Sequence, residues 1–335
     1  MSRDPESEYE PMGQGDSNQE ARLEINARIV FMGTPAFAAI ILEGLLQAGW
    51  NVRAVVCQPD RPMGRGRKVL PPAAKVTAEA WQIPVWQPAR MKDPTFLDAL
   101  RALVPDLIVV AAYGRILPQE ILVLPIHGCY NVHGSLLPAY RGAAPIRRAV
   151  MNNEQVTGIT IFRMDEGMDT GDILAAEPLA IDPEETAGEL TERLARLAVR
   201  VLPGALREVI LGRARLVSQD PSKATYAPVL RKKDGEILWE LSAEEIRNRI
   251  RGLDPWPGAY TFWKGKRLRL WKAVAEQIES PGFPGQLLGV SEQGMRVASG
   301  KGVLCVTSLQ LEGGRRMTVE EFLRGHGLKG GERLG

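Results

Sequence analysis

Residues 28–57 read RIVFMGTPAFAAIILEGLLQAGWNVRAVVC, and this stretch decides the fold. The apolar run at 28–32 predicts a strand, and residues 33–35 turn the chain out of it. An amphipathic helix follows as far as Gly49, and its apolar residues share one face: Phe37, Ile40, Ile41, Leu45 and Leu46. Residues 51–57 form a second apolar run. A strand, a helix and a strand in this order predict a βαβ unit, and hence a parallel sheet.

The alternation of strands and helices continues as far as residue 212. Apolar runs and amphipathic patterns predict strands at 106–112, 128–133 and 157–163, and helices at 74–81, 94–103 and 185–211. The run at 106–112 is apolar almost throughout, which is typical of a central parallel strand buried on both faces. We therefore expect residues 28–212 to form an α/β domain, with a Rossmann-like, open, mainly parallel sheet and helices on both of its faces.

Beyond residue 212 the pattern changes. Residues 213–230 contain two prolines and few periodic apolar runs, so we expect a linker there. We expect a short strand at 236–239, and then a helix that begins with a capping box of Ser242 and Glu245. Short alternating runs between glycine-rich turns follow at 260–263, 267–275, 285–290, 294–298 and 303–310. They predict a small OB-like β-barrel within residues 231–335.

Composition limits the class of protein. The 335 residues are 44% hydrophobic and 24% charged, as in an ordinary soluble protein of about two domains. No apolar run reaches the ~20 residues of a membrane helix. The three cysteines and three histidines are scattered, which argues against disulfides and metal sites and favours a reducing, cytoplasmic location. Residues 1–27 are polar and acidic, without the apolar core of a signal peptide, and we expect a disordered acidic extension.

Charge is distributed unevenly along the chain. Residues 1–27 hold 2 basic and 7 acidic residues, residues 28–212 hold 19 of each, and residues 213–335 hold 21 basic and 14 acidic residues. A net charge of +7 on the last part suggests a polyanionic partner that meets mainly this part. A surface that only serves solubility would explain the same charge.

The first catalytic candidates lie where strand 128–133 ends, because open parallel sheets bind ligands beyond the carboxyl ends of their strands. Asn131 and His133 are two residues apart and therefore project from the same side. An amide can donate to a developing oxyanion, and an imidazole can move a proton near neutral pH, which suits acyl transfer. A carboxylate of the acidic loop 165–172, which follows strand 157–163, could orient His133 and favour its protonated form. The alternatives are a strand end with a structural histidine and a solvated turn.

Two loops bear on nucleotide or RNA binding. The turn at 33–35 is not a G-x-G-x-x-G fingerprint, and the chain contains no phosphate-binding P-loop motif. The glycine-containing loop 58–68 carries four basic residues against one acidic residue: Arg61, Arg65, Arg67 and Lys68. Such a loop could grip phosphates or enter a groove of RNA, or it could be a mobile solvated loop.

Together, the motifs resemble those of the methionyl-tRNA formyltransferases, a branch of the folate-dependent formyltransferases. The residues that carry the resemblance are Gly33-Thr34-Pro35 with Phe37, the loop 58–66, the segment from Asn131 to Pro145, Met168 to Asp172, and Asp254 to Pro257. The likeness extends over residues 28–335, while the acidic residues 1–27 have no counterpart in the family.

The resemblance implies an activity and a set of site residues. The activity is formyl transfer from 10-formyltetrahydrofolate to the α-amine of initiator methionyl-tRNA, with Asn131, His133 and Asp169 as the catalytic residues. The implied donor pocket comprises Ser135, Leu136, Leu137 and Pro138, the wall Tyr113, Gly114, Arg115, Ile116 and Leu117, and Asp165 and Gly167. The tRNA would meet the basic loop 58–68 and the C-terminal domain of a monomer that binds neither membrane nor DNA.

Three rival readings stay open at this point. A sugar-nucleotide N-formyltransferase would share Asn131, His133 and Asp169, but it should lack the basic loop and the basic C-terminal domain. A glycinamide ribonucleotide formyltransferase usually has one domain only. An RNA-binding protein that has kept the fold without catalysis is the rival from another class, and the complete Asn–His–Asp set argues against it.

Overall fold

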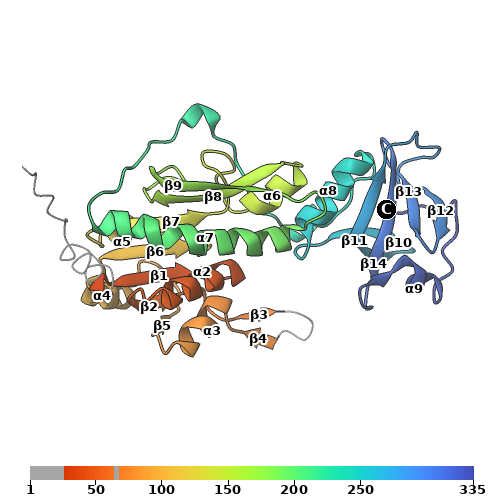
Figure 1. Ribbon diagram of the computed structural model, residues 1–335. Coiled ribbons are helices and arrows are strands. Elements are labelled where there is room, and N and C mark those ends of the chain that lie inside the picture. The colour runs from red at the N-terminus through yellow and green to blue at the C-terminus, as the bar shows by residue number, and fades with distance from the viewer. Residues whose placement is uncertain (1–25, 64–67) are drawn as a thin grey trace, which may run out of the picture.

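The computed structural model describes residues 26–63 and 68–335. Residues 1–25 of the expected acidic extension, together with Arg65 and Arg67, lie outside the described residues. Two sheets follow one another along the length of the molecule, and α8 (Ala243–Leu253) lies between them (Figure 1). A separate two-stranded ribbon, β3 (Arg61–Met63) with β4 (Lys68–Leu70), projects from the first part.

The first sheet has seven strands in the order β5-β2-β1-β6-β7-β8-β9. Its strands are β1 (Ile29–Gly33), β2 (Val52–Val56), β5 (Val85–Trp86), β6 (Leu107–Ala111), β7 (Cys129–His133), β8 (Val156–Arg163) and β9 (Ile173–Ala180). The first five are parallel to one another, β8 pairs antiparallel with β7, and β9 pairs antiparallel with β8. This confirms the Rossmann-like, mainly parallel sheet. Sequence patterns did not predict β5, which has two residues, or β9, an edge strand whose exposed half contains Glu177 and Pro178.

Helices cover both faces of this sheet, as expected. Ile29 and Phe31 of β1 face one core with α2 (Ala36–Gln47), α3 (Ala73–Ala80), α6 (Pro145–Met151) and α7 (Ala187–Ile210). Val30 and Met32 face the other core, with α4 (Pro94–Ala102) and α5 (Gln119–Leu122). Helix α7 begins with a capping box of Thr186 and Glu189. Successive side chains of β1 therefore point in turn to the two cores, and both faces of the strand are buried.

The second sheet is antiparallel, which agrees with the expected OB-like β domain. Its strands are β10 (Ala259–Trp263), β11 (Lys266–Glu276), β12 (Leu287–Ser291), β13 (Gly294–Ala298), β14 (Val303–Leu311) and β15 (Met317–Thr318), and α9 (Val319–Leu323) closes it. The capping box of Ser242 and Glu245 at the start of α8 is confirmed. The strand expected at 236–239 is wrong, because a short 3-10 helix η2 (Lys232–Gly235) leads into one isolated bridge and the chain then turns toward α8.

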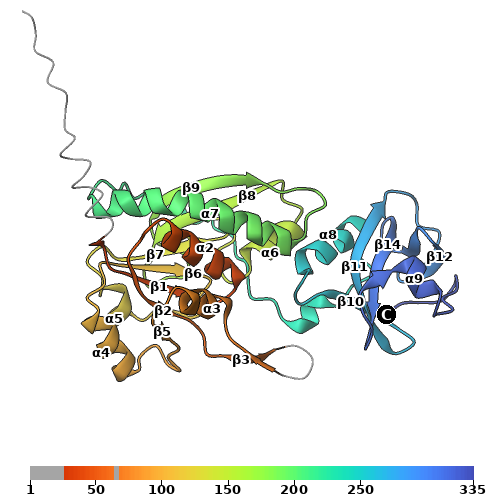
Figure 2. The same cartoon turned by 60° about the horizontal axis from the view of Figure 1, so that its bottom comes forward.

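Helix α8 fastens the second sheet to the first part (Figure 2). Gly252 of α8 lies so close to α6 that a Cβ atom there would come within 2.4 Å of Met151 Cγ and 2.9 Å of the Arg147 carbonyl. Arg251 Nη1 donates to the carbonyl of Glu185 over 3.0 Å, just ahead of α7. Because Gly252 has no side chain, α8 and α6 can pack this closely.

Candidate active site

Strand β7 carries Asn131 and His133 to the carboxyl end of the first sheet. It pairs with β6 on one side and with β8 on the other, where His133 lies opposite Thr160. The His133 side chain is only 6% exposed, and its ring packs edge-on against Phe162 with the ring centroids 6.4 Å apart. Asn131 Oδ1 is buried and has no hydrogen-bond partner among the residues that the structure describes. An unpaired buried oxygen of this kind is costly unless a ligand supplies a donor.

Each ring nitrogen of His133 faces an oxygen atom. Nε2 lies 3.0 Å from the carbonyl oxygen of Tyr140, and Nδ1 lies 3.6 Å from Asp169 Oδ2. A carbonyl oxygen only accepts, so the contact with Tyr140 requires a proton on Nε2. Nδ1 can then hold a second proton toward the carboxylate. The two contacts fix the orientation of the imidazole ring between the loop after β7 and the loop that carries Asp169.

Asp169 reaches His133 from the loop between β8 and β9. Its backbone has φ +55°, the left-handed region that non-glycine residues seldom adopt. Its Oδ2 accepts a hydrogen bond of 2.7 Å from the N–H of Gly142, in the loop after β7. The structure thus brings together His133 and Asp169, which are 36 positions apart in the sequence, and fixes the carboxylate with a backbone donor.

The segment expected to hold the formyl donor, Ser135 to Pro138, is tied to β8. Thr160 Oγ1 donates to the carbonyl of Ser135 over 2.7 Å and accepts from the N–H of Leu137 over 3.0 Å. Ser135 Oγ in turn donates to the carbonyl of Ala139 over 2.6 Å. Ser135 and Leu137 are buried, and Leu136 is half-buried. Sequence analysis missed Thr160, whose only signal is a hydroxyl in the apolar run of β8.

The expected pocket wall, residues 113–117, is held by the buried side chains of Tyr113 and Leu117 and by the contacts of Arg115. The Tyr113 side chain is buried with its hydroxyl on Met91 Sδ at 3.0 Å, and burial raises the pKa of Tyr113 to about 12. Arg115 Nη1 donates to the carbonyls of Pro88 and Ala89. Gly114 has φ +78°, Leu117 is buried and Ile116 is exposed. The tyrosine and arginine side chains therefore hold the wall in place.

Gln58 is a second residue that sequence analysis did not single out. Its Nε2 donates to the carbonyls of Tyr113 and Gly114, at 3.1 and 3.3 Å, and its Oε1 accepts 2.9 Å from Arg61 Nη2. Arg61, expected to bind tRNA, is thus tied to the pocket wall through Gln58. Arg65 and Arg67 lie outside the described residues, and Lys68 begins β4.

Asp165 and Gly167 form a tight turn ahead of Asp169. Asp165 Oδ1 accepts from the N–H of Gly167 over 3.0 Å and from Thr170 Oγ1 over 2.6 Å. A Cβ at residue 167 would lie 1.9 Å from Thr170 Oγ1, so a larger residue there would displace the Thr170 side chain from its hydrogen bond to Asp165. These two residues shape the loop that presents Asp169.

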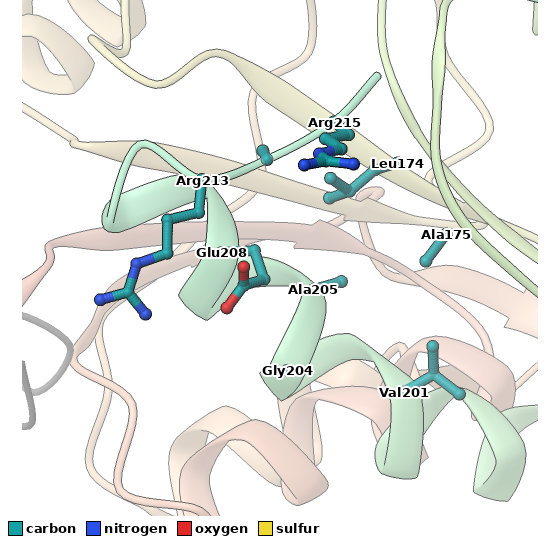
Figure 3. A pocket seen from close by; sticks show the side chains of 9 residues that line it. Leu174, Ala175, Val201, Gly204, Ala205, Glu208, Arg213 and Arg215 are labelled. Carbon is teal, nitrogen blue, oxygen red and sulfur yellow. The ribbon is translucent and has the colours of Figure 1, made fainter. Parts of the chain in front are cut away.

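An open hollow of about 880 Å³ lies elsewhere, between α7 and β9 (Figure 3). Its lining is Leu174, Ala175, Val201, Gly204, Ala205, Glu208, Arg213, Ala214 and Arg215. None of the expected site residues lines it, and it offers one carboxylate and two guanidinium groups around an apolar floor. We place the candidate site at the end of β7 because the groups suited to acyl transfer converge there.

Three further observations concern metal sites, membrane helices and disulfides. In the described ranges, 26–63 and 68–335, no group of three or more His, Cys, Asp or Glu side chains could hold a metal ion. None of the helices that the structure describes is long and apolar enough to cross a membrane. All three cysteines are free, with Cys57 and Cys129 buried.

Both halves of the chain match family models. Residues 27–206 match the formyl transferase model, and residues 229–327 match the C-terminal domain model of formyl transferases. Methionyl-tRNA formyltransferases are similar over 92% of the chain. That of Syntrophus aciditrophicus (strain SB) is 48% identical with 98% of its length covered, and that of Moorella thermoacetica is 49% identical with 99% covered.

Two solved structures share the fold. HypX from Aquifex aeolicus in complex with tetrahydrofolic acid aligns with a TM-score of 0.62 and 17% identity, over 88% of this chain and 46% of that one. The N-formyltransferase from Helicobacter canadensis, in complex with folinic acid and dTDP-3-aminofucose, has a TM-score of 0.61 and 18% identity, over 84% and 99%. At these identities the likeness concerns the fold alone.

Proposed function

The chain belongs to the methionyl-tRNA formyltransferases of the formyl transferase family, and from this premise we propose how its residues carry out the reaction. The enzyme transfers the formyl group of 10-formyltetrahydrofolate to the α-amino group of initiator methionyl-tRNA. The products are formylmethionyl-tRNA, used to initiate translation, and tetrahydrofolate.

One observation carries the assignment of the catalytic residues. At the end of β7, the buried Oδ1 of Asn131 has no partner in the described part of the chain. Two residues on, His133 faces Asp169 across 3.6 Å. A substrate N–H would satisfy the Asn131 oxygen, and the amide N–H₂ could donate to an acyl oxygen. These groups fit a folate formyl donor meeting an amine. When bound, the donor supplies the electrophilic formyl carbon.

Each of the three residues has a separate role in the proposal. Asn131 and the protonated ring of His133 donate to the formyl oxygen as negative charge develops there. Asp169 holds the imidazole through Nδ1 and assists removal of the proton from the attacking amine. The contact of Nε2 with the Tyr140 carbonyl must loosen if Nε2 is the donor to substrate. As the new bond to the α-amine forms, the bond between the formyl carbon and the folate nitrogen breaks, and the proton removed from the amine balances the proton that this nitrogen takes up. No covalent bond to the enzyme is needed.

We propose that the donor lies along Ser135 to Pro138. The wall 113–117 and the turn of Asp165 and Gly167 would enclose its ring system, because an apolar slot with exposed backbone groups suits a flat heterocycle. The tight bonds of Thr160 to Ser135 and Leu137 support this placement, since they preorganise the loop.

Residues 28–212 would perform the transfer, and residues 231–335 would hold the tRNA. Cationic groups lie over aromatic rings on the second sheet: Arg267 is 4.5 Å from the Tyr260 ring centroid, and Arg316 is 5.1 Å from that of Trp271. Such pairs suit contacts with phosphates and bases. Arg61, Arg65, Arg67 and Lys68 would add contacts near the aminoacyl end. We propose a cytoplasmic monomer.

The test is a transfer assay with the full chain. Purified enzyme is mixed with 10-formyltetrahydrofolate and with initiator or elongator methionyl-tRNA, and formylmethionine is quantified. We expect formylation of the initiator species and little of the elongator species. An aminosugar nucleotide serves as the control acceptor. Failure with the initiator tRNA, or preference for the sugar nucleotide, would overturn the proposal.

A further inference from the structure

Residues 213–230, expected to be a linker, run directly past the catalytic loops. Near its beginning, Val217 pairs with Ile173 of β9 through two backbone hydrogen bonds of 2.8 and 2.9 Å. Near its end, the Arg141 N–H donates to the carbonyl of Thr225 over 2.8 Å, and the Ala227 N–H donates to the carbonyl of Arg141 over 2.7 Å. The segment is therefore fastened on both sides of the site.

Between these two attachments, the side chain of Gln219 joins the two loops that contact His133. Its Nε2 donates to the carbonyls of Asp169 and Gly171, at 2.9 and 2.7 Å. Its Oε1 accepts from Nε and Nη2 of Arg141, at 3.2 and 2.7 Å. Arg141 is 5% exposed, so its guanidinium group is held in a largely buried setting.

Those contacts reach the immediate neighbours of the catalytic groups. Arg141 lies between Tyr140, whose carbonyl faces His133 Nε2, and Gly142, whose N–H binds the Asp169 carboxylate. One carboxamide thus connects the loop facing one ring nitrogen of His133 with the loop facing the other.

The backbone of Asp169 explains why such a connection is needed. Its φ of +55° costs about 1 kcal/mol or more for a residue with a side chain, and such a conformation persists only where the surroundings hold it. The following turn is also tight, because a Cβ at Gly171 would come within 1.8 Å of the Arg163 carbonyl. The two N–H groups of Gln219 bind the carbonyls on either side of Thr170 and so fix this turn.

We infer that Gln219 is a positioning residue for formyl transfer, which holds Asp169 against His133 through the Asp169 and Gly171 carbonyls. This inference rests on the proposed function. A misplacement of about 1 Å in a catalytic group can cost about 10²-fold in rate. We therefore expect Gln219→Leu, which keeps the side-chain volume and removes all four hydrogen bonds, to lower kcat by about 10- to 100-fold and to change KM for either substrate by less than about 3-fold.

Two companion variants separate positioning from support of the fold. Gln219→Glu still accepts from Arg141 but cannot donate to the two carbonyls, so it should lose as much kcat as the leucine variant while keeping the buried guanidinium group paired. The control is Ser218→Ala, at the residue next to Gln219, which removes an exposed hydrogen bond of 2.8 Å from Ser218 Oγ to Asp172 Oδ1. Its kcat should stay within about 2-fold of that of the wild type.

The decisive measurement is a double-mutant cycle with Asp169. If Gln219 acts through that carboxylate, Gln219→Leu should lower kcat by less than about 2-fold in an Asp169→Ala enzyme. Additive losses, a change confined to KM, or a fully active Gln219→Glu would overturn the inference. An active wild type in the same assay keeps these outcomes separate from a failure of the proposed function.

Discussion

Thr160 offers a direct test of how the donor loop is held. Its side chain is 0% exposed on β8, and its hydroxyl makes one hydrogen bond to Ser135 O and another from Leu137 N–H. Thr160→Val keeps the shape and removes both bonds. Each of the two buried backbone groups left without a partner costs about 1–3 kcal/mol, so we expect a loss of about 2–6 kcal/mol in the free energy of unfolding.

Thermal unfolding followed by circular dichroism measures this loss. At about 2–4 °C per kcal/mol, the transition of the first sheet should fall by roughly 4–24 °C. KM for the formyl donor should rise because Ser135 and Leu137 lose their anchor. Thr160→Ser keeps the hydroxyl and should recover most of both effects. Thr307→Val, which removes a weak 3.4 Å bond on β14, is the matched control. A Thr160→Val enzyme that melts within about 2 °C of wild type would refute the reasoning.

Three further outcomes are expected. His133→Asn should lower kcat by about 10²–10⁴-fold with an unchanged circular dichroism spectrum, and normal turnover would remove His133 from the mechanism. Binding of tRNA should weaken steeply as the salt concentration rises, and a tRNA affinity that does not change with salt would contradict contacts with phosphates. Arg65→Ala should raise KM for tRNA without altering folate binding. Burial raises the pKa of Cys57 to about 11 and that of Cys129 to about 12. At pH 8 only about 10⁻³ of Cys57 is then thiolate, so alkylation of both cysteines in the native protein should be slow. Both pKa values lie above the value of about 8.5 that a cysteine has in the unfolded chain. The two protonated thiols therefore favour the folded state fully below pH 8.5, and this contribution to the free energy of unfolding is lost as the pH rises toward 11. Unfolding curves at pH 8 and at pH 10.5 check this.

Sequence periodicity predicted those parts of the fold in which one physical requirement dominates. Strands β1 and β6 are buried on both faces and therefore show apolar runs. The edge strand β9 has no such requirement, since Glu177 and the residues around it face solvent. At 236–239, Ile237 and Trp239 alternate as in a strand and are indeed buried, but the ladder stops after one bridge because the chain must turn to begin α8.

The site was predictable in part for a similar reason. The spacing of Asn131 and His133 on one strand places them on one side, a local property that the sequence displays. Asp169 could be paired with His133 only through the family resemblance. The contacts of Gln219 with Arg141 and Asp169 span 78 and 50 positions, and no periodic pattern marks them. Polar side chains that bind backbone groups from distant loops therefore stay hidden until the chain is folded.

The composition of β9 also bears on the behaviour of the protein in concentrated solution. A sheet edge with free N–H and C=O groups is a template on which a strand of another molecule can add. In the described part of the chain, Val217 occupies the beginning of this edge through its pairing with Ile173. Farther along, Pro178 has no N–H to offer, and Glu177 places a charge where a second chain would have to approach. The weak strand signal that hid β9 from sequence analysis is therefore also the feature that protects this edge of the sheet against aggregation.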